Sequence, residues 1–499
     1  MRETSLGVPV ARATALAATF GLACVLVAGC SGGGGGAKPD GGGFIPTDGG
    51  SSMPDAGVDG GTDAGMQTSD KGYECQQDPL TLYTDPEGKW PQDQVAMDLA
   101  AGASDFQAVW SFAPARLAYT QASIFTVTVP STGAPGDAGP VDGLPSDVNP
   151  GQYEPPPFVG HAPTVLRTGE SFLVSWSRTG VLTCDENGAN CMYTGYEIFT
   201  RGVTPGDTLT TGPMQMITSE EGAAATEPAG VPSGSGALLT WIRGVATMSG
   251  GKHYDEAPMA AVVGSDGKRA GSPVAVTTNP ISGHTVLGPL ADGNVAYLYI
   301  DQGVADTADS SLRLLPLDAA TGAVVAGAQP TTLSAASDVS FDSLDFDYAG
   351  NANGGLAVYG SLGSGVVRVK PVSPNGGDGG PVQTISPEND SSRGVSVTTI
   401  AGDFAVSYLD QTTGAIRVAF VGPSGTLLNT IDVGTAKNIK RVRTKIRRAG
   451  DKLLVVWSDV VDPEAPAVQD PTMPDAPLQG GAVLANRMTC TPDTSQASQ

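Results

Sequence analysis

The stretch RTGESFLVSW, residues 167–176, decides the fold of this chain. Gly169 lies at a tight turn, where glycine supplies the positive φ that a twisted two-residue hairpin requires. The residues after the turn are mostly apolar and end on Trp176. A glycine hairpin that leads into a short apolar strand with a terminal aromatic residue predicts two antiparallel strands, the second of them buried.

The apolar strand with its terminal aromatic residue occurs seven times, at intervals of 49 to 66 residues. A glycine hairpin also precedes it at residues 291–294, 400–403 and 448–451. Recurrence of one unit at such a period is typical of propellers and solenoids. The seven aromatic positions are Trp110, Trp176, Trp241, Tyr299, Tyr359, Tyr408 and Trp457.

The segments that follow each aromatic residue favour a propeller. A third strand is expected in six repeats, at residues 124–129, 197–200, 260–263, 312–315, 366–369 and 416–420. A fourth strand opens on proline at residues 213–217, 273–277, 330–334 and 381–385. Proline cannot donate to a strand ladder and therefore belongs on an edge strand. The chain is predicted to be all-β, a seven-bladed β-propeller of four-stranded antiparallel blades spanning residues 73–490.

The two ends of the repeat array predict closure into a ring. The last repeat has strands near residues 441–447, 452–458 and 482–488, and no outer strand of its own. Residues 79–84 copy the proline-led pattern of a fourth strand, so the N-terminal segment is expected to supply it. Cys75 and Cys490 then lie close enough for a disulfide.

The remaining cysteines agree with an oxidising compartment. Cys184 and Cys191 bracket a turn-rich loop and are predicted to form a second disulfide. Zinc is the alternative, but no paired ligands of a tetrahedral site lie near these cysteines in the sequence.

The N-terminus carries an export signal. Arg2 and Arg12 precede an apolar stretch that ends at Cys30 and is short for a membrane span. The segment from Val27 to Cys30 resembles the lipobox of bacterial lipoproteins. The resemblance implies a signal peptide over residues 1–29, cleavage before Cys30, and a lipid (diacylglycerol and palmitate) on that cysteine. It places the protein at the outer membrane, facing the periplasm or the cell surface.

Residues 30–72 are predicted to be a disordered tether, because their glycine- and aspartate-rich repeats contain hardly any large apolar side chain. Residues 491–499 are expected to form a disordered tail. The formal net charge of −24 argues against nucleic acid and against direct adhesion to anionic lipid. We expect a monomer, anchored in the membrane only through its lipid.

Two histidines and a basic run are the candidate ligand-binding residues. His161 and His284 each stand at the start of an expected innermost strand, with Arg393 at the equivalent position of another repeat. That position faces the mouth of a propeller's channel; Val95, Thr226, Leu344 and Val442 occupy it elsewhere. Capping of the strand ends is the plainer explanation for the histidines.

The basic run covers residues 440–448 in an otherwise acidic chain. Because strand side chains alternate, its cations Arg441, Arg443, Lys445 and Arg447 share one side of the expected strand. Unpaired burial of four cations is prohibitive. We expect them to pair with acids of adjoining blades, Asp98 among them, or alternatively to bind an anion in the channel.

One segment of the fifth repeat resembles the calcium loop of integrin-type propeller blades. Its oxygen ligands would be Asp345, Asp347, Asn351 and Asn353, although Ala349 replaces one expected ligand. No other cofactor is predicted.

Two functions remain open. The first is a non-enzymatic binding or scaffold propeller that engages a protein or glycan through the long loops after the aromatic positions. The second is a secreted hydrolase or lyase with its site at the channel mouth. The absence from the sequence of any convergent acid, base and nucleophile favours the first, and a channel-mouth cluster of His161, His284 and carboxylates would favour the second.

Overall fold

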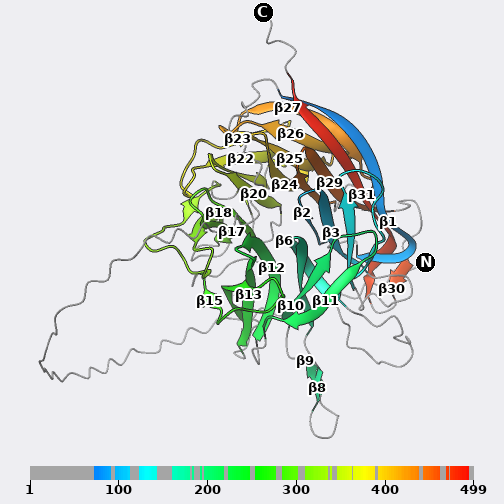
Figure 1. Cartoon of the computed structure of the whole chain (residues 1–499), viewed down its shortest axis with the longest axis vertical. Coiled ribbons are helices and arrows are strands. Elements are labelled where there is room, and N and C mark those ends of the chain that lie inside the picture. Colours follow the sequence, from blue (N-terminus) through cyan, green and yellow to red (C-terminus); the bar gives the residue numbers. More distant parts are fainter. Residues whose placement is uncertain are drawn as a thin grey trace, which may run out of the picture. The chain divides into compact units, whose positions relative to one another are not determined.

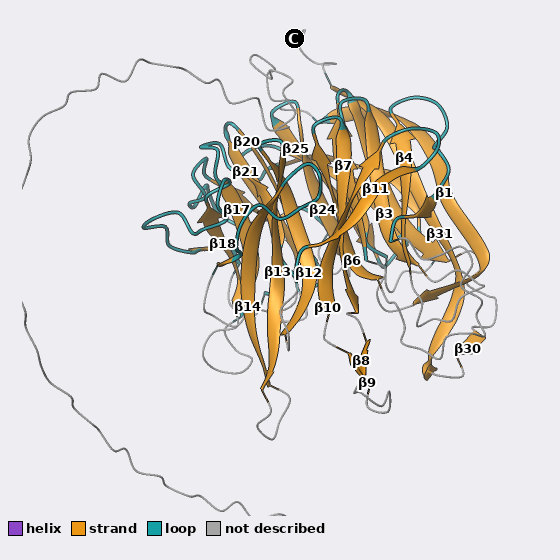
Figure 2. Cartoon of the chain, turned by 60° about the horizontal axis from the view of Figure 1, so that its bottom comes forward, coloured by secondary structure: helices purple, strands orange, loops and turns teal. Residues whose placement is uncertain are grey.

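In the computed structural model, strands and turns make up the described residues, and no helix occurs among them (Figure 2). None of the described segments is a helix long and apolar enough to cross a membrane. The chain divides into residues 1–52 and residues 53–499, and everything described lies in the second unit. The described residues are 72–91, 96–112, 123–142, 160–179, 182–184, 191–193, 196–218, 223–247, 253–276, 284–301, 310–334, 338–339, 345–361, 364–387, 392–437, 442–460, 468–470 and 473–493.

Seven antiparallel sheets form the fold, and each begins with its innermost strand (Figure 1). Blade 1 contains β2 (Met97–Ala101), β3 (Asp105–Phe112), β4 (Ser123–Pro130) and β5 (Gly139–Pro140). Blade 2 contains β6 (Gly160–Thr168), β7 (Ser171–Thr179), β10 (Tyr196–Thr204) and β11 (Thr210–Met216). Blade 3 contains β12 (Ala223–Ser233), β13 (Gly236–Thr247), β14 (His253–Val263) and β15 (Val274–Ala275). Blade 4 contains β16 (Val286–Pro289), β17 (Val295–Asp301), β18 (Ser311–Leu317) and β19 (Thr331–Thr332).

The remaining blades complete the ring. Blade 5 contains β20 (Phe346–Asn351), β21 (Gly354–Gly360), β22 (Val367–Val372) and β23 (Gln383–Thr384). Blade 6 contains β24 (Ser392–Ile400), β25 (Asp403–Asp410), β26 (Ala415–Val421) and β27 (Leu427–Thr435). Blade 7 contains β28 (Thr444–Ala449), β29 (Lys452–Val460), β31 (Met473–Pro492) and β1 (Tyr73–Pro91). Each innermost strand contacts the next, and β28 contacts β2, so the seven-bladed propeller closes.

The N-terminal strand closes the ring as the sequence predicts. β1 lies beside β31 along the outer edge of blade 7, where the two are blue and red in Figure 1. Their register pairs Pro79 with Asn486 and Cys75 with Cys490. These cysteines form a disulfide with a Cα–Cα distance of 4.1 Å. Both strands extend beyond the predicted segments, and β30 (Val468–Asp470) pairs with β31 as an extra strand.

The start of β1 also fastens blade 7 to blade 6. The Tyr73 ring stacks on Phe420, with ring centroids 4.6 Å apart. Its hydroxyl donates to Asp403 Oδ2 at 2.8 Å. Asn429 receives the Tyr73 N–H at 3.0 Å and donates back to its carbonyl at 2.9 Å. The first residues of the folded chain therefore contact two blades.

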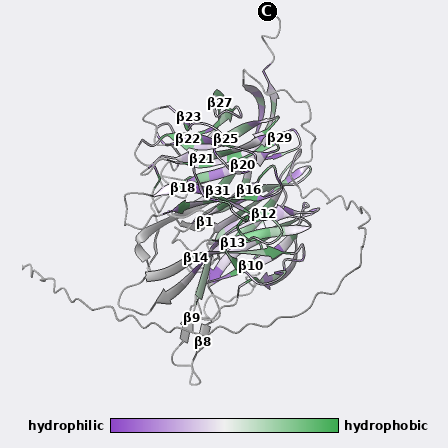
Figure 3. Cartoon of the chain, turned by 90° about the vertical axis from the view of Figure 1, so that its left-hand side faces the viewer, coloured by the Kyte–Doolittle hydropathy of each residue, from purple (hydrophilic) through white to green (hydrophobic). Residues whose placement is uncertain are grey.

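The repeated aromatic residues lie on the second strand of every blade and are buried, as predicted. Glycines with positive φ stand in the predicted hairpins, Gly169 at 63° and Gly450 at 58° among them. Apolar residues lie along the blade strands (Figure 3). The seven buried clusters each combine side chains of two neighbouring blades, one cluster for each junction of the ring. Because the core lies between blades, its burial depends on the closed ring.

Candidate binding site at the channel mouth

Three innermost strands carry the same backbone irregularity near their first residues. Register shifts interrupt β6 between His161 and Thr164, β12 between Thr226 and Ala229, and β24 between Arg393 and Ser396. Inside each bulge one residue has positive φ, and these residues are Ala162 (45°), Glu227 (51°) and Gly394 (65°). Bulges of this kind redirect side chains and are common beside functional sites. Here they line the centre of the ring.

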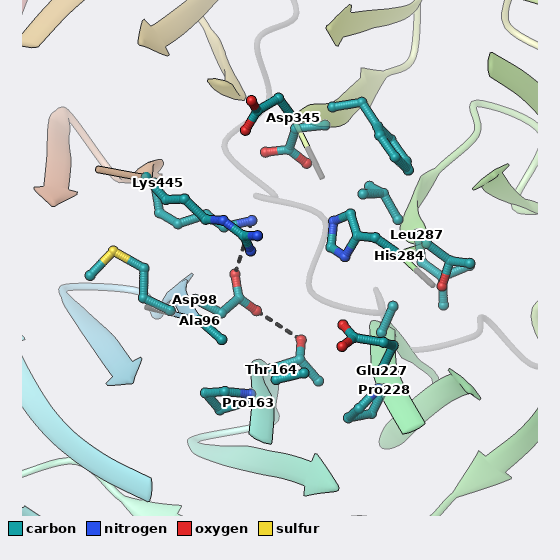
Figure 4. Close-up of a pocket in the computed structure, with 18 of the residues that line it drawn as sticks. Ala96, Asp98, Pro163, Thr164, Glu227, Pro228, His284, Leu287, Asp345 and Lys445 are labelled. Atoms are coloured by element: carbon teal, nitrogen blue, oxygen red, sulfur yellow. Dashed lines mark hydrogen bonds and ion pairs between the residues drawn. The ribbon is translucent and has the colours of Figure 1, made fainter. Parts of the chain in front are cut away.

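A cavity of ≈ 80 Å³ lies at this end of the innermost strands. Residues from all seven blades line it, so it lies at the mouth of the central channel. Figure 4 shows Asp98, Glu227, His284, Asp345 and Lys445 around the same space. A volume of this size holds a few water molecules and suits one sugar ring or one anionic group better than a long ligand.

Two carboxylates of the cavity wall form hydrogen bonds between neighbouring blades. Asp98 Oδ2 accepts hydrogen bonds from Thr164 Oγ1 at 2.8 Å and Val165 N at 3.0 Å in the next blade. Asp347 Oδ2 accepts the equivalent bonds in blade 6, from Ser396 Oγ at 2.6 Å and Val397 N at 3.1 Å. The two blade junctions therefore have the same hydrogen-bond arrangement. In each, a carboxylate accepts a bond from a backbone N–H of the neighbouring bulged strand.

The basic run pairs with these carboxylates across the channel. Arg447 Nη1 lies 3.3 Å from Asp347 Oδ2, and Lys445 Nζ lies 3.8 Å from Asp98 Oδ1. The predicted alternation is confirmed, because Thr444 and Ile446 are buried between these cations. Burial lowers the pKa of Arg447, but the Asp347 and Asp98 carboxylates outweigh it and raise the pKa overall. The predicted pairing with Asp98 is confirmed for Lys445 and Arg447.

Other polar side chains of the cavity form no such hydrogen bonds between blades. Among the described residues, Glu227 and Arg443 have no hydrogen-bond or ion-pair partner. His284 has only an edge contact with the Phe346 ring, with centroids 5.1 Å apart. Thr285 is 2% exposed, and its Oγ1 has no hydrogen-bond partner within the described part of the chain. The buried Thr285 hydroxyl, without a hydrogen-bond partner, thus lies beside three polar side chains that form no hydrogen bond among the described residues. Such a group of unpaired polar atoms calls for an explanation, and a bound ligand is one.

The electrostatics of the cavity set the protonation states of two groups. Burial, together with the nearby Lys445 and Arg443, lowers the pKa of His284 to about 3. Its imidazole is therefore neutral at physiological pH. Burial raises the pKa of Glu227, although Arg443 opposes this shift. The cavity thus combines a neutral imidazole, a carboxyl group of raised pKa and a cation, Arg443, that has no ion-pair partner among the described residues.

The structure brings together half of the ligand-binding candidates named from the sequence. His284, Arg443 and Lys445 line the cavity. The side chains of His161 and Arg393, and all of Arg441, lie outside the described residues. Glu227 was missed, because the sequence assigns Thr226 to its position and the bulge moves the chain by one residue. A proline after the positive-φ residue, as in Ala162–Pro163 and Glu227–Pro228, is the signal that marks it.

The calcium loop expected in blade 5 does not assemble. Asp345 and Asp347 lie at the channel-mouth end of β20, whereas Asn351 and Asn353 form the hairpin at its other end. Asn351 lies four residue steps along the strand from Asp347, roughly 13 Å away, which is too far for one ion. Asn351 Oδ1 instead accepts the Asn353 N–H at 2.9 Å. No group of three metal-binding side chains occurs within the described ranges.

The second predicted disulfide stays a prediction. Cys184 and Cys191 face each other in the register of a separate two-stranded sheet, β8 (Leu182–Cys184) and β9 (Cys191–Tyr193). Their side chains lie outside the described part of the structure.

No protein-family model and no curated protein sequence matches the chain. Solved structures resemble its fold. A Dyadobacter fermentans protein of unknown function has 9% identity and a TM-score of 0.43, over 82% of this chain and 98% of its own. An alpha-L-arabinanase of Penicillium chrysogenum has 12% identity and a TM-score of 0.45 over the same shares. Trypanosoma rangeli sialidase has 9% identity and a TM-score of 0.39, over 82% of this chain and 59% of its own. The chain is thus a seven-bladed β-propeller with structural neighbours among arabinanases and sialidases.

Proposed function

We propose that this protein is an exported, lipid-anchored propeller that binds the carboxylate-bearing end unit of a glycan at its channel mouth. The observation that carries the proposal is Arg443, which lines the cavity without an ion-pair partner among the described residues. Arg443 is half-buried, and partial desolvation of a guanidinium is costly unless an anion offsets its charge. Arginine is suited to this role because its planar fork binds a carboxylate through two hydrogen bonds.

The other polar groups of the cavity fit a sugar. Lys445, which is paired with Asp98 at 3.8 Å, adds a second positive charge to the cavity wall. Neutral His284 and the Thr285 hydroxyl supply donors and acceptors for ring hydroxyl groups. The small volume and the formal charge of −24 favour one local negative charge over a polyanion such as nucleic acid. A single uronate unit satisfies all of these requirements.

Most side chains of the long loops that the sequence suggested as a contact face lie outside the described part of the chain. The channel mouth is therefore the surface on which we base the proposal.

Replacing Arg443 by glutamine should weaken uronate binding by about 10- to 100-fold, since a hydrogen-bonded charge pair contributes roughly 1.5–3 kcal/mol. Isothermal titration calorimetry of the tether-free protein with D-glucuronate and D-galacturonate measures this, with neutral D-glucose for comparison. Arg448→Gln is the matched control, because Arg448 lies on the same strand but does not line this cavity. Equal affinity for glucose and the uronates, or no binding of either uronate, would contradict the proposal.

Replacing Cys30 by serine should release the protein from membranes or stall its maturation, because the lipid has no other attachment thiol at the cleavage site. Cys24→Ser is the matched control, since Cys24 lies within the same apolar stretch and is removed with the signal. Membrane fractionation of cells that express each variant distinguishes them. Unchanged membrane retention and processing of Cys30→Ser would refute the anchor.

A further inference from the structure

Glu227 occupies a strained backbone position that does not require a carboxylate. Its φ of 51° is unfavourable for a side-chain-bearing residue, at a cost of about 1 kcal/mol or more. Ala162 and Gly394 occupy the same place in the bulges of β6 and β24. The bulge therefore forms without a glutamate, and glycine would adopt it with less strain. Strained residues of this kind concentrate at functional sites.

The surroundings of Glu227 favour its protonated form. Its carboxyl group has no hydrogen-bond partner in the described part of the chain, and burial raises its pKa, although Arg443 opposes this shift. His284 beside it is neutral, so no imidazolium competes as an acid near neutral pH. A carboxyl group whose pKa is raised by burial is a recurring feature of general acids.

A second carboxylate stands across the cavity. Figure 4 shows Asp345 and Glu227 on opposite sides of His284. Asp345 Oδ1 accepts one hydrogen bond, from Gly394 N at 3.2 Å, and its Oδ2 has no partner among the described residues. Asp98 and Asp347 are engaged in holding blades together, so Asp345 is the carboxylate with a free oxygen. Two carboxyl groups that flank one sugar site are the requirement for hydrolysis of a glycosidic bond.

We propose that Glu227 and Asp345 hydrolyse the glycosidic bond of the acidic sugar held by Arg443 and Lys445. The inference rests on the proposed function and adds a reaction to it. Glu227 transfers its proton to the glycosidic oxygen as the bond from that oxygen to the anomeric carbon breaks. A water molecule adds to the anomeric carbon and gives a proton to Asp345. One water is consumed, and proton exchange with solvent restores the acid and the base.

The test combines three glucuronides with two variants. Hydrolysis of 4-methylumbelliferyl α- and β-D-glucuronide and of methyl β-D-glucuronide is measured from pH 4 to 9. Glu227→Gln should lose about 100- to 10,000-fold in kcat/KM on the methyl glycoside. The loss should be smaller on the umbelliferyl glycosides, whose leaving group needs little protonation. Asp345→Asn should lose comparable activity on both kinds of substrate. Exposed Glu170→Gln is the control and should behave as wild type.

Further readouts separate catalysis from folding and binding. Glu227→Gln should bind D-glucuronate as wild type does, should lose the basic limb of the pH profile, and should be no less stable, because the amide keeps the shape of a carboxyl group that has no hydrogen-bond partner among the described residues. Equal losses of Glu227→Gln on good and poor leaving groups would overturn the acid role. Wild-type protein that binds uronate but cleaves none of the three glucuronides would overturn the hydrolysis and leave the binding proposal standing. Absence of uronate binding would overturn both.

Discussion

Replacing both Cys75 and Cys490 by serine is expected to lower the free energy of unfolding by about 2–5 kcal/mol while the propeller still folds. The disulfide spans 415 residues and joins the two strands that complete blade 7. Without it, the unfolded chain regains the freedom of nearly its whole length, whereas β1 and β31 keep their hydrogen bonds. Urea denaturation followed by tryptophan fluorescence measures the change.

Two further measurements test whether the loss of stability in the cysteine variant comes from the loss of ring closure. A reducing agent should lower the stability of the wild-type protein to that of the variant and leave the variant unchanged. Deletion of residues 73–85 should have a larger effect, since it removes most of β1 and leaves β31 as an exposed edge. An unpaired strand edge is a template for other chains, so this variant should aggregate. A stable, monomeric deletion variant would show that the ring does not depend on the N-terminal strand.

Most of the fold could be predicted because each blade has a local sequence pattern and the same pattern recurs in every repeat. Each aromatic residue from Trp110 to Trp457 lies on a buried second strand, and the glycine hairpins predicted before four of these strands need a backbone that few other residues adopt. A repeat with a weak pattern can be aligned on the other six. Closure followed from a missing strand at one end and a surplus strand at the other. Strand lengths were predicted less well, because β1 and β31 continue past the residues that fit the pattern, whereas the outer strands β15, β19 and β23 are shorter than predicted.

The site was harder to predict because it depends on backbone detail. Period-two alternation correctly placed Arg443, Lys445 and Arg447 on the channel side, and the expected partner Asp98 pairs with Lys445 and Arg447. The bulge at Glu227 breaks that alternation, and a positive φ at a glutamate has no composition signal except the following proline. The calcium loop failed for the opposite reason. Its oxygen-bearing residues are close in sequence, but an extended strand separates them in space.

Replacing Asp347 by asparagine is expected to destabilise the protein by about 3 kcal/mol, because it leaves the part-buried Arg447 with only the more distant Asp98 as a partner. Asp347 is 1% exposed and accepts bonds from Tyr348 N, Ser396 Oγ, Val397 N and Arg447 Nη1. The neutral amide keeps the shape but not the charge. Exposed Asp266→Asn is the matched control. Asp266 pairs with Lys268 at 3.2 Å, and both side chains are exposed, so its loss should leave the stability essentially unchanged.

The pH dependence of the stability lost in Asp347→Asn shows whether the missing charge causes the loss. Burial raises the pKa of Asp347, but Arg447, Lys445 and the Ser396 hydroxyl together outweigh burial and hold the pKa below its usual value of 3.8. A depressed carboxyl pKa stabilises the folded state above the unfolded pKa, and this contribution disappears as pH falls through the folded value. The gap in stability between wild type and Asp347→Asn should therefore be constant from pH 5 to 7 and narrow below pH 4. A gap that stays the same down to pH 2.5 would mean that lost packing, and not the charge pair with Arg447, explains the destabilisation. In that case Arg447→Gln would also have little effect, whereas the charge-pair account expects the double variant to be less destabilised than the sum of the single ones.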